Sequence, residues 1–320
     1  MYWTRLIDPD SVYGASKRGK KLVSLGYKRE DEFIVKLAEE LKVAAKKAGY
    51  DLTAQYSENS VALQIEQVET ARRSEVKGMI INLVTPESAP EILKAAGDMK
   101  VVFMAYVPAD MSILNPNAIY VGADQSEAGR LQGEWLANYF KERGKTEIRY
   151  ILIKGVEYLP ITKERTEHAL KALADAGIKA IPVVPPVIAN YERNEATSKL
   201  LPILSSGVKF DAIISNDDAM ALGAIDAFEM LGMDPTKTVI VGIDAIEPGV
   251  RALLEGKLAM TVYQNRKERA AATIKALDNM LNGRPFSDGL ANLVSKDNPY
   301  AIIFPFEIVT RYKVPKDLYL

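Results

Sequence analysis

Short apolar runs alternate repeatedly with longer runs of helical periodicity along this chain. The first apolar run, residues 21–27, is followed by residues 33–48, where apolar side chains recur at the spacing of one helix face. Gly49 is expected to end that helix, because glycine takes the left-handed C-cap conformation without steric cost. Continuous apolar runs such as 79–81 predict parallel strands with helices covering both faces.

The predicted elements form two successive series of similar length. The first has strands at 21–27, 50–56, 78–84 and 101–106, with helices at 33–48, near 61–68 and at 88–97. The second, after 120–122, has strands at 148–154, 180–187, 212–215, 239–243 and 259–263, with helices at 126–142, 162–176, 192–205, 219–231 and 248–255. A chain of 320 residues is too long to fold around a single small hydrophobic core. The pattern therefore predicts an α/β fold with two doubly wound parallel-sheet lobes.

Composition excludes several classes of function. Lys and Arg number 41 against 42 Asp and Glu, so the basic excess of a nucleic-acid-binding protein is missing. Cysteine is absent, and the single histidine, His168, is expected on the surface of a helix, so no thiolate site, histidine-rich metal site or histidine-based catalytic dyad is expected. No glycine-rich phosphate loop follows a strand. These observations predict a protein that is not an enzyme and needs no cofactor.

Polar and aromatic residues gather where predicted strands end, the edge at which doubly wound sheets bind ligands. They are Asp31, Phe33, Asn82, the Asn216-Asp217-Asp218 run, Asp244 and Gln264. Carboxylates and amides suit hydroxyl groups, and flat rings suit the apolar face of a sugar. Each Asp or Asn taken alone fits a helix cap equally well, as Asn216 or Asp218 would before residue 219. The whole set at one edge predicts a ligand cleft.

Longer motifs give a specific resemblance. They are 27–28 with 31–33, 81–84, 120–124 with 132–133, 216–224, 241–245, and 256–258 with 261–262. With these, the sequence from about residue 21 to the C-terminus resembles the periplasmic galactose/glucose-binding and ribose-binding proteins. The resemblance implies two ligand-binding lobes, of residues 1–122 plus 265–303 and 123–264 plus 304–320. It also implies a hinge of three chain crossings near 121–124, 264–266 and 303–306.

The resemblance further implies roles for individual residues. Phe33 and Tyr191 would stack on the two faces of a sugar, and Asp31, Asn216, Asp244 and Arg165 would bind its polar groups, with Gln264 at the hinge. Asn82 belongs to the first-lobe wall. Tyr106 either adds a ring or hydroxyl to the site or packs within its lobe.

Three positions depart from the family pattern. Ala105, Leu159 and Ile161 stand where galactose/glucose-binding relatives have polar residues. Each hydroxyl left unpaired there would cost about 1–3 kcal/mol. We therefore expect a sugar other than galactose or glucose, with fewer hydroxyls or an apolar substituent. Residues 141–146 are too few and too basic for the calcium loop of those relatives, so no structural calcium is expected.

The resulting expectation is the solute-binding component of an ABC-type uptake system, closing on a small polar ligand outside the cytoplasm. Its partners would be a membrane permease and, as a further candidate, a chemosensory receptor; it would act as a monomer. Residues 1–21 lack the apolar core of a signal peptide, so export requires that the signal has been removed. The alternative is the effector-sensing core of a LacI-type transcription repressor, but residues 1–20 are too short for a helix-turn-helix and linker.

Overall fold

The computed structural model describes residues 20–318, which form two compact units. The first unit is the chain as far as Ala123 together with Asn265–Phe304, and the second is Asp124–Gln264 together with the chain from Pro305 onward. The chain thus passes from one unit to the other three times. The sequence expectations about a signal peptide and a DNA-binding headpiece concern residues 1–21 and 1–20, and of these residues 1–19 lie outside the described residues, as do 319–320.

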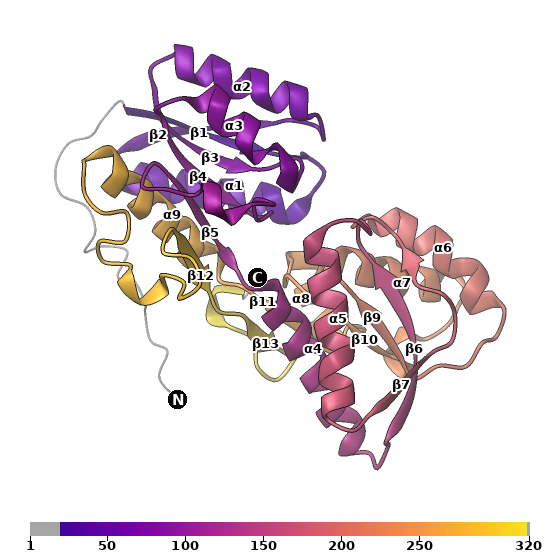
Figure 1. The fold of residues 1–320 in the computed structure, drawn as a ribbon. Coiled ribbons are helices and arrows are strands. Elements are labelled where there is room, and N and C mark those ends of the chain that lie inside the picture. The colour runs from indigo at the N-terminus through magenta and orange to yellow at the C-terminus, as the bar shows by residue number, and fades with distance from the viewer. Residues whose placement is uncertain (1–19, 319–320) are drawn as a thin grey trace. The chain divides into compact units, whose positions relative to one another are not determined.

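The first unit is built on a six-stranded parallel sheet (Figure 1). Its strand order is β2-β1-β3-β4-β5-β12. The strands are β1 (Lys20–Gly26), β2 (Tyr50–Tyr56), β3 (Val76–Asn82), β4 (Lys100–Met104), β5 (Ala118–Ala123) and β12 (Ala301–Phe304). The chain leaves β1 toward one edge and returns in β3 on its other side. The carboxyl ends of β1 and β3 therefore flank the topological switch point, where such sheets bind ligands.

Helices cover both faces of this sheet, as the apolar runs predicted. They are α1 (Glu32–Lys47) and α9 (Arg266–Leu281) on one face, and α2 (Val61–Arg73) and α3 (Ala89–Ala96) on the other. Leu22 packs in the core under α1 and α9, whereas its neighbour Val23 packs under α2 and α3. Gly49, with φ +79°, directly follows the C-cap of α1, as expected.

The second unit has a smaller parallel sheet, with the order β10-β9-β6-β7. Its strands are β6 (Glu147–Lys154), β7 (Lys179–Pro182), β8 (Val187–Ile188), β9 (Ala212–Ser215) and β10 (Val239–Val241). The prediction of one strand over 180–187 is wrong, because β7 pairs with the first half of β6 and β8 with its end. Pro185 and Pro186 between them have no N–H group to continue a ladder.

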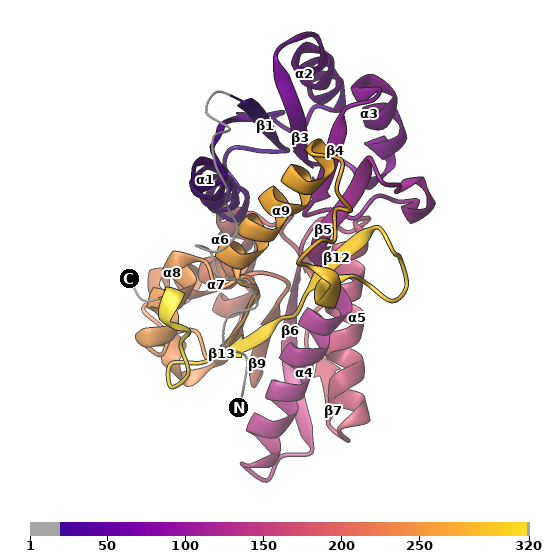
Figure 2. The ribbon, with the colours of Figure 1, turned by 90° about the vertical axis from the view of Figure 1, so that its left-hand side faces the viewer.

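The helices of the second unit pack very closely. They are α4 (Gln125–Lys141), α5 (Pro160–Asp175), α6 (Arg193–Ser205), α7 (Asp218–Met230) and α8 (Glu247–Leu254). Helices α4 and α5 lie side by side (Figures 1 and 2). A Cβ placed on Gly129 would lie 2.3 Å from the carbonyl oxygen of Arg165, and one on Gly133 would lie 2.2 Å from that of Ala169. The two helix backbones touch at these glycines, which fixes where α5 carries Arg165.

The last predicted strand of the second series is present, and it has an additional partner that the sequence did not indicate. Strand β11 (Thr261–Tyr263) forms an antiparallel pair with β13 (Glu307–Val309). Residues 259–262 also run parallel to β10 and the residues after it: Met260 bridges Val241, the Ala259 N–H donates to the Ile240 carbonyl, the Gly242 N–H to that of Met260 and the Asp244 N–H to that of Val262. The antiparallel partner, β13, comes from the C-terminal segment, and no sequence pattern near β11 predicts this pairing. Short 3-10 turns occupy Pro86–Ser88, Met111–Ile113, Pro235–Lys237, Ala291–Leu293 and Lys316–Leu318. Within residues 20–318, no helix is long and apolar enough to cross a membrane.

Candidate functional site

At the switch point of the first unit, Asp31 has two roles. It is the N-cap of α1, where its Oδ1 accepts a hydrogen bond from the Ile34 N–H at 3.0 Å. Its Oδ2 accepts a hydrogen bond from the Tyr27 hydroxyl. The capping alternative therefore holds for Asp31, and the carboxylate is favoured there by the positive end of the helix.

Tyr27 and Tyr106 form an aromatic wall beside Asp31. Their rings stack with centroids 5.0 Å apart and planes inclined by 16°. Burial, followed by the charge of Asp31 and the neighbouring Tyr106, raises the pKa of Tyr27 well above its usual range, so its hydroxyl stays protonated and can donate. Ala105 has φ +57°, and its carbonyl accepts a 3.2 Å hydrogen bond from the Tyr120 hydroxyl. The turn that carries Tyr106 is thus held in place.

Asn82 and Phe33 lie at the same edge of the first unit. Asn82 is 2% exposed, and its Oδ1 has no hydrogen-bond partner among residues 20–318. Its carbonyl accepts a 3.0 Å hydrogen bond from buried Gln64, a positioning residue that sequence reasoning missed. The half-buried ring of Phe33 lies 6.0 Å and 5.9 Å from the guanidinium carbons of Arg266 and Arg269. The Phe33 ring therefore lies near two cationic side chains of α9.

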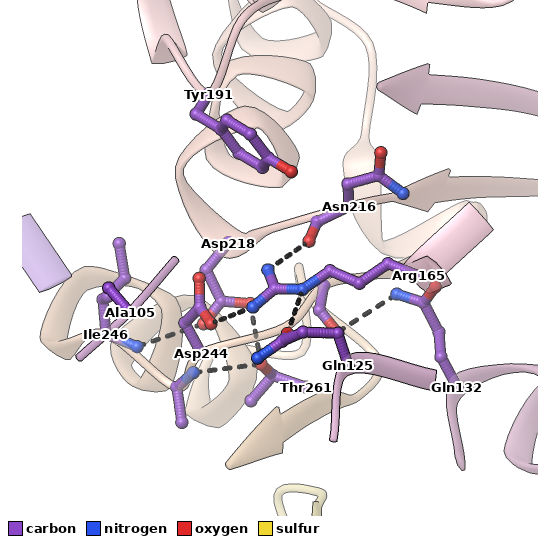
Figure 3. Close-up of polar contacts among 12 residues, drawn as sticks. Ala105, Gln125, Gln132, Arg165, Tyr191, Asn216, Asp218, Asp244, Ile246 and Thr261 are labelled. Carbon is purple, nitrogen blue, oxygen red and sulfur yellow. Dashed lines mark hydrogen bonds and ion pairs between the residues drawn. The ribbon is translucent and has the colours of Figure 1, made fainter. Parts of the chain in front are cut away.

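Arg165 is the centre of the polar cluster in the second unit (Figure 3). The side chain is buried, with 5% of the residue exposed. It donates to the Asn216 carbonyl at 2.8 Å, to Asp244 Oδ1 at 3.1 Å and to Gln125 Oε1 at 2.9 Å. Burial opposes its charge, but Asp244 and the other groups around it raise its pKa overall. Arg165 therefore stays charged and ties together the start of α4, the end of β9 and the loop after β10.

The side chain of Asn216 does not face this cluster. Asn216 is fully buried; its Oδ1 accepts from the Gly155 N–H at 3.2 Å, and its Nδ2 donates to Thr166 Oγ1 at 3.0 Å. In Figure 3 its amide is turned away from the Arg165 guanidinium. In this structure Asn216 serves the site through its carbonyl oxygen.

Asp217, the residue that follows Asn216, is a further carboxylate after the end of β9. Its Oδ1 caps α7 by accepting from the Met220 N–H at 2.9 Å. Asp217 is 7% exposed, and its charge acts on Arg165 and on the Tyr191 hydroxyl. The signal that could have found it is the start of α7 at Asp218, which makes Asp217 the N-cap at the strand end.

Tyr191 lies directly over the loop that follows β6. A Cβ on Gly155 would fall 2.0 Å from Cζ of the Tyr191 ring, so only glycine leaves room for it. Its hydroxyl lies 2.7 Å from Thr162 Oγ1. Asn190 and Tyr191 have φ of +53° and +64°, a conformation that tightly packed surroundings must hold. Burial raises the pKa of Tyr191 above its usual value, which keeps the hydroxyl neutral.

The other residues singled out in the sequence lie at the end of β11 or on α5. Gln264 directly follows β11 and is 3% exposed. Leu159 is buried at the N-cap of α5, and Ile161 is half-buried in its first turn. His168 lies on α5, with Nδ1 2.9 Å from the Glu164 carbonyl oxygen. Among residues 20–318, no three carboxylates or histidines are grouped as a metal site would require.

Asp218 is buried behind Asp244 in the second unit, and this burial predicts a pH effect. Burial, then the charges of Asp244 and Asp217, hold the pKa of Asp218 well above its usual range. Between its ordinary pKa, about 3.9, and the raised pKa, the native protein keeps a proton that the unfolded chain loses. Stability must therefore fall as pH rises through this window. In Asp218→Asn we expect a shallower fall, measured by denaturant unfolding from pH 4 upward.

The control for that experiment is Asp110→Asn. The exposed carboxyl of Asp110 has its pKa lowered by hydrogen bonds from Ser112, so its loss cannot reproduce the slope. Parallel pH curves for wild type and Asp218→Asn would show that Asp218 does not retain its proton in the native state.

A separate groove of about 570 Å³ lies elsewhere on the second unit. Its lining includes Trp135 and Tyr139 of α4, Val239 at the start of β10, and Tyr312. None of the predicted ligand-binding residues lines it. It lies toward the amino end of β10 and is distinct from the strand-end cluster around Arg165.

Comparison with known proteins gives consistent matches. Residues 23–285 match the family model described as periplasmic binding protein domain. The D-galactose/methyl-galactoside binding periplasmic protein of Haemophilus influenzae is 31% identical over 275 residues, covering 82% of each chain. The ribose import binding protein of Salmonella typhimurium is 24% identical, covering 78% of this chain and 81% of its own. An ABC transporter solute binding protein from Bacillus halodurans, solved with bound myo-inositol, is 25% identical, with a TM-score of 0.76 over 93% of this chain and 97% of that one.

Proposed function

The chain belongs to the family of periplasmic binding protein domains and is a solute-binding protein of the sugar ABC transporter type, and we propose that it binds a small ring polyol. The observation that carries the proposal is the Arg165 cluster: a buried arginine that pairs with Asp244 at the strand ends, with Tyr191 in the same region of the unit (Figure 3). The repressor alternative finds no support among the matched proteins.

Each group in the proposed site has a distinct physical task. The carboxylates of Asp31, Asp217 and Asp244 accept hydrogen bonds from ligand hydroxyls, and such charge-assisted bonds are strong in a site from which water is excluded. Tyr191 covers one apolar face of the ring, and Phe33 is proposed for the other. Arg165, held by three protein acceptors, chiefly orients Asp244. Asn82 adds an acceptor through Oδ1, and Tyr106 contributes through the wall it forms with Tyr27.

The proposed class of ligand rests on the names of the matched proteins and on the aliphatic residues Ala105, Leu159 and Ile161. The matched proteins are named or titled for D-galactose, ribose and myo-inositol, all small molecules rich in hydroxyls. Ala105, Leu159 and Ile161 cannot bind hydroxyls through their side chains. A polyol other than galactose or glucose is therefore proposed, with an apolar or less hydroxylated end against these residues.

Binding is proposed to work by closure rather than by chemistry. A ligand that contacts both units stabilises a closed state by its greater affinity for that state. The crossings near Ala123, Gln264 and Phe304 are the proposed hinge, and the two units the proposed lobes. Outside the cytoplasm, the closed monomer would deliver the polyol unchanged to a membrane permease, and a chemosensory receptor is a second proposed partner. The protein is proposed to catalyse no reaction.

A thermal-shift and calorimetry panel tests the ligand class. Purified protein is titrated with myo-inositol, D-ribose, D-allose, D-galactose and nucleosides. A ligand at about 100 times its Kd stabilises the native state by about 2.7 kcal/mol, which is readily seen as a rise in Tm. We expect a polyol to give this rise in wild type, and Tyr191→Ala to abolish it. Tyr312→Ala, at an 83% exposed position, is the matched control and should bind as wild type. A rise with a nucleoside and none with any polyol would disprove the proposal.

A further inference from the structure

The loop that carries Asp244 has a strained backbone. Asp244 and Ala245 have φ of +105° and +46°, in a region that residues with a Cβ rarely adopt. Such conformations cost about 1–3 kcal/mol each and persist only where the surroundings hold them. The orientation of Asp244 toward Arg165 therefore depends on what fixes this loop.

A buried carboxyl fixes it from behind. Asp218, at the start of α7, is fully buried, and its Oδ2 accepts from the Ile246 N–H at 3.1 Å. Its Oδ1 lies 2.7 Å from Thr261 Oγ1, which itself accepts from the Ala245 N–H at 3.2 Å. One side chain thereby restrains two consecutive amides next to Asp244. Figure 3 shows Asp218, Thr261 and Ile246 together beside Asp244.

Two glycines make room for this carboxyl. A Cβ on Gly242 would lie 2.1 Å from Asp218 Oδ1, and a Cβ on Gly249 would lie 2.5 Å from Oδ2. Asp218 is thus enclosed on both sides by backbone. Its position has little freedom, so the loop amides it holds have little freedom either.

We infer that Asp218 is a positioning residue for ligand recognition: with Thr261 it holds the loop that aims the Asp244 carboxylate at Arg165 and at the ligand. The inference rests on the proposed function. Asp218 itself contacts no ligand. A merely structural role would lower stability when Asp218 is removed and leave the affinity of the folded protein unchanged.

A double-mutant cycle separates these roles. Wild type, Asp218→Ala, Asp244→Ala and the double variant are titrated by calorimetry with myo-inositol, D-ribose, D-allose and D-galactose, well below each variant's Tm. Asp218→Ala is expected to weaken binding about tenfold or more, a coupling of the size seen for residues of one network. In the Asp244→Ala background it should change the affinity little. Asp218→Asn, which can keep both contacts, should stay within about threefold of wild type. Unchanged affinity in Asp218→Ala, or full additivity in the cycle, overturns the inference.

A ligand-free measurement decides the same point independently of the proposed function. Hydrogen exchange of the Ala245 and Ile246 amides is measured by NMR relative to the amides of Ile213 and Ile214 in β9. Asp218→Ala should speed exchange at the two loop amides more than in β9. If both pairs change equally, Asp218 does not hold the loop. If no polyol binds wild type while the loop amides respond, the proposed function fails and the positioning of the loop stands.

Asp278→Ala is the matched control. Asp278 is also a buried carboxyl, but it lies in the first unit, where it accepts from the Tyr50 hydroxyl at 2.6 Å and from Arg284 at 2.7 Å. Its loss should lower Tm and leave both affinity and the loop amides unchanged. A comparable loss of affinity in Asp278→Ala would show that general destabilisation explains the effect of Asp218→Ala.

Discussion

Arg165→Met is expected to lower the free energy of unfolding by about 3–5 kcal/mol and to remove ligand binding. Methionine keeps most of the side-chain volume but donates to none of the three acceptors. The Asp244 carboxylate, with 15% of its side chain exposed, would then lie in a largely buried position without its arginine. Leaving one charge of a buried pair uncompensated is the costly change. Denaturant unfolding and calorimetry with the polyol panel measure both effects.

Two variants test the cause of that loss. Asp244→Asn added to Arg165→Met removes the uncompensated charge and should restore part of the stability without restoring binding. Arg130→Met removes an arginine whose side chain is 47% exposed and which pairs with Glu134 at 2.7 Å on the same unit. Exposed pairs of this kind contribute about 0.2–1 kcal/mol. An Arg165→Met variant no less stable than Arg130→Met would refute a structural role for the Arg165 cluster.

Gly129→Ala is expected to destabilise the protein by about 1–3 kcal/mol and to weaken binding. In an exposed helix the same change would stabilise by up to about 1 kcal/mol, so the predicted sign is opposite to helix propensity. The reason is that the new methyl group would lie 2.3 Å from the Arg165 carbonyl oxygen. Backbone cannot rotate out of the way as a side chain can, so α4 and α5 must separate. Arg165 moves with α5, and the polar cluster moves with Arg165.

The control for Gly129→Ala lies on the same helix. Glu134, with 45% of its side chain exposed, contacts Arg130 on the surface of α4, and Glu134→Ala should change stability by no more than about 0.5 kcal/mol. A Gly129→Ala variant that is as stable as wild type, with unchanged affinity, would show that the α4–α5 contact can relax without disturbing the site.

The layers of the fold could be predicted from the sequence because buried faces require apolar residues at the regular spacing of a helix or a strand. In α1 the buried residues Ile34, Leu37 and Leu41 recur at helical spacing, and in β1 successive residues alternate between two cores. Strand ends could also be located, which brought Asp31 and Asp244 forward as candidates. These features involve residues that are close together in the sequence, so they can be recognised without the structure.

What the sequence could not predict depends on contacts between distant segments. Nothing near β11 indicates that β13 will pair with it, and nothing in α4 indicates that Gly129 will face the backbone of α5. Asn216 and Asp217 are adjacent strand-end residues of similar size, and only the start of α7 at Asp218 decides which of them caps that helix. The role of Asp218 could not be predicted either, because it depends on contacts with Thr261 and Ile246, which are distant in the sequence.

The sheet of the first unit has a consequence for how the chain folds. Its edge strand β12 and its helix α9 are encoded after Gln264, beyond the central stretch of the second unit. A chain emerging from its N-terminus can therefore assemble the sheet from β6 to β10 while the earlier sheet still lacks an edge strand and the cover that α9 provides. Closing that gap requires pairing across a long intervening stretch, and such long-range pairing slows folding. The first segment made is thus the last to be completed, and the unit that holds Asp31 depends on residues near the far end of the chain.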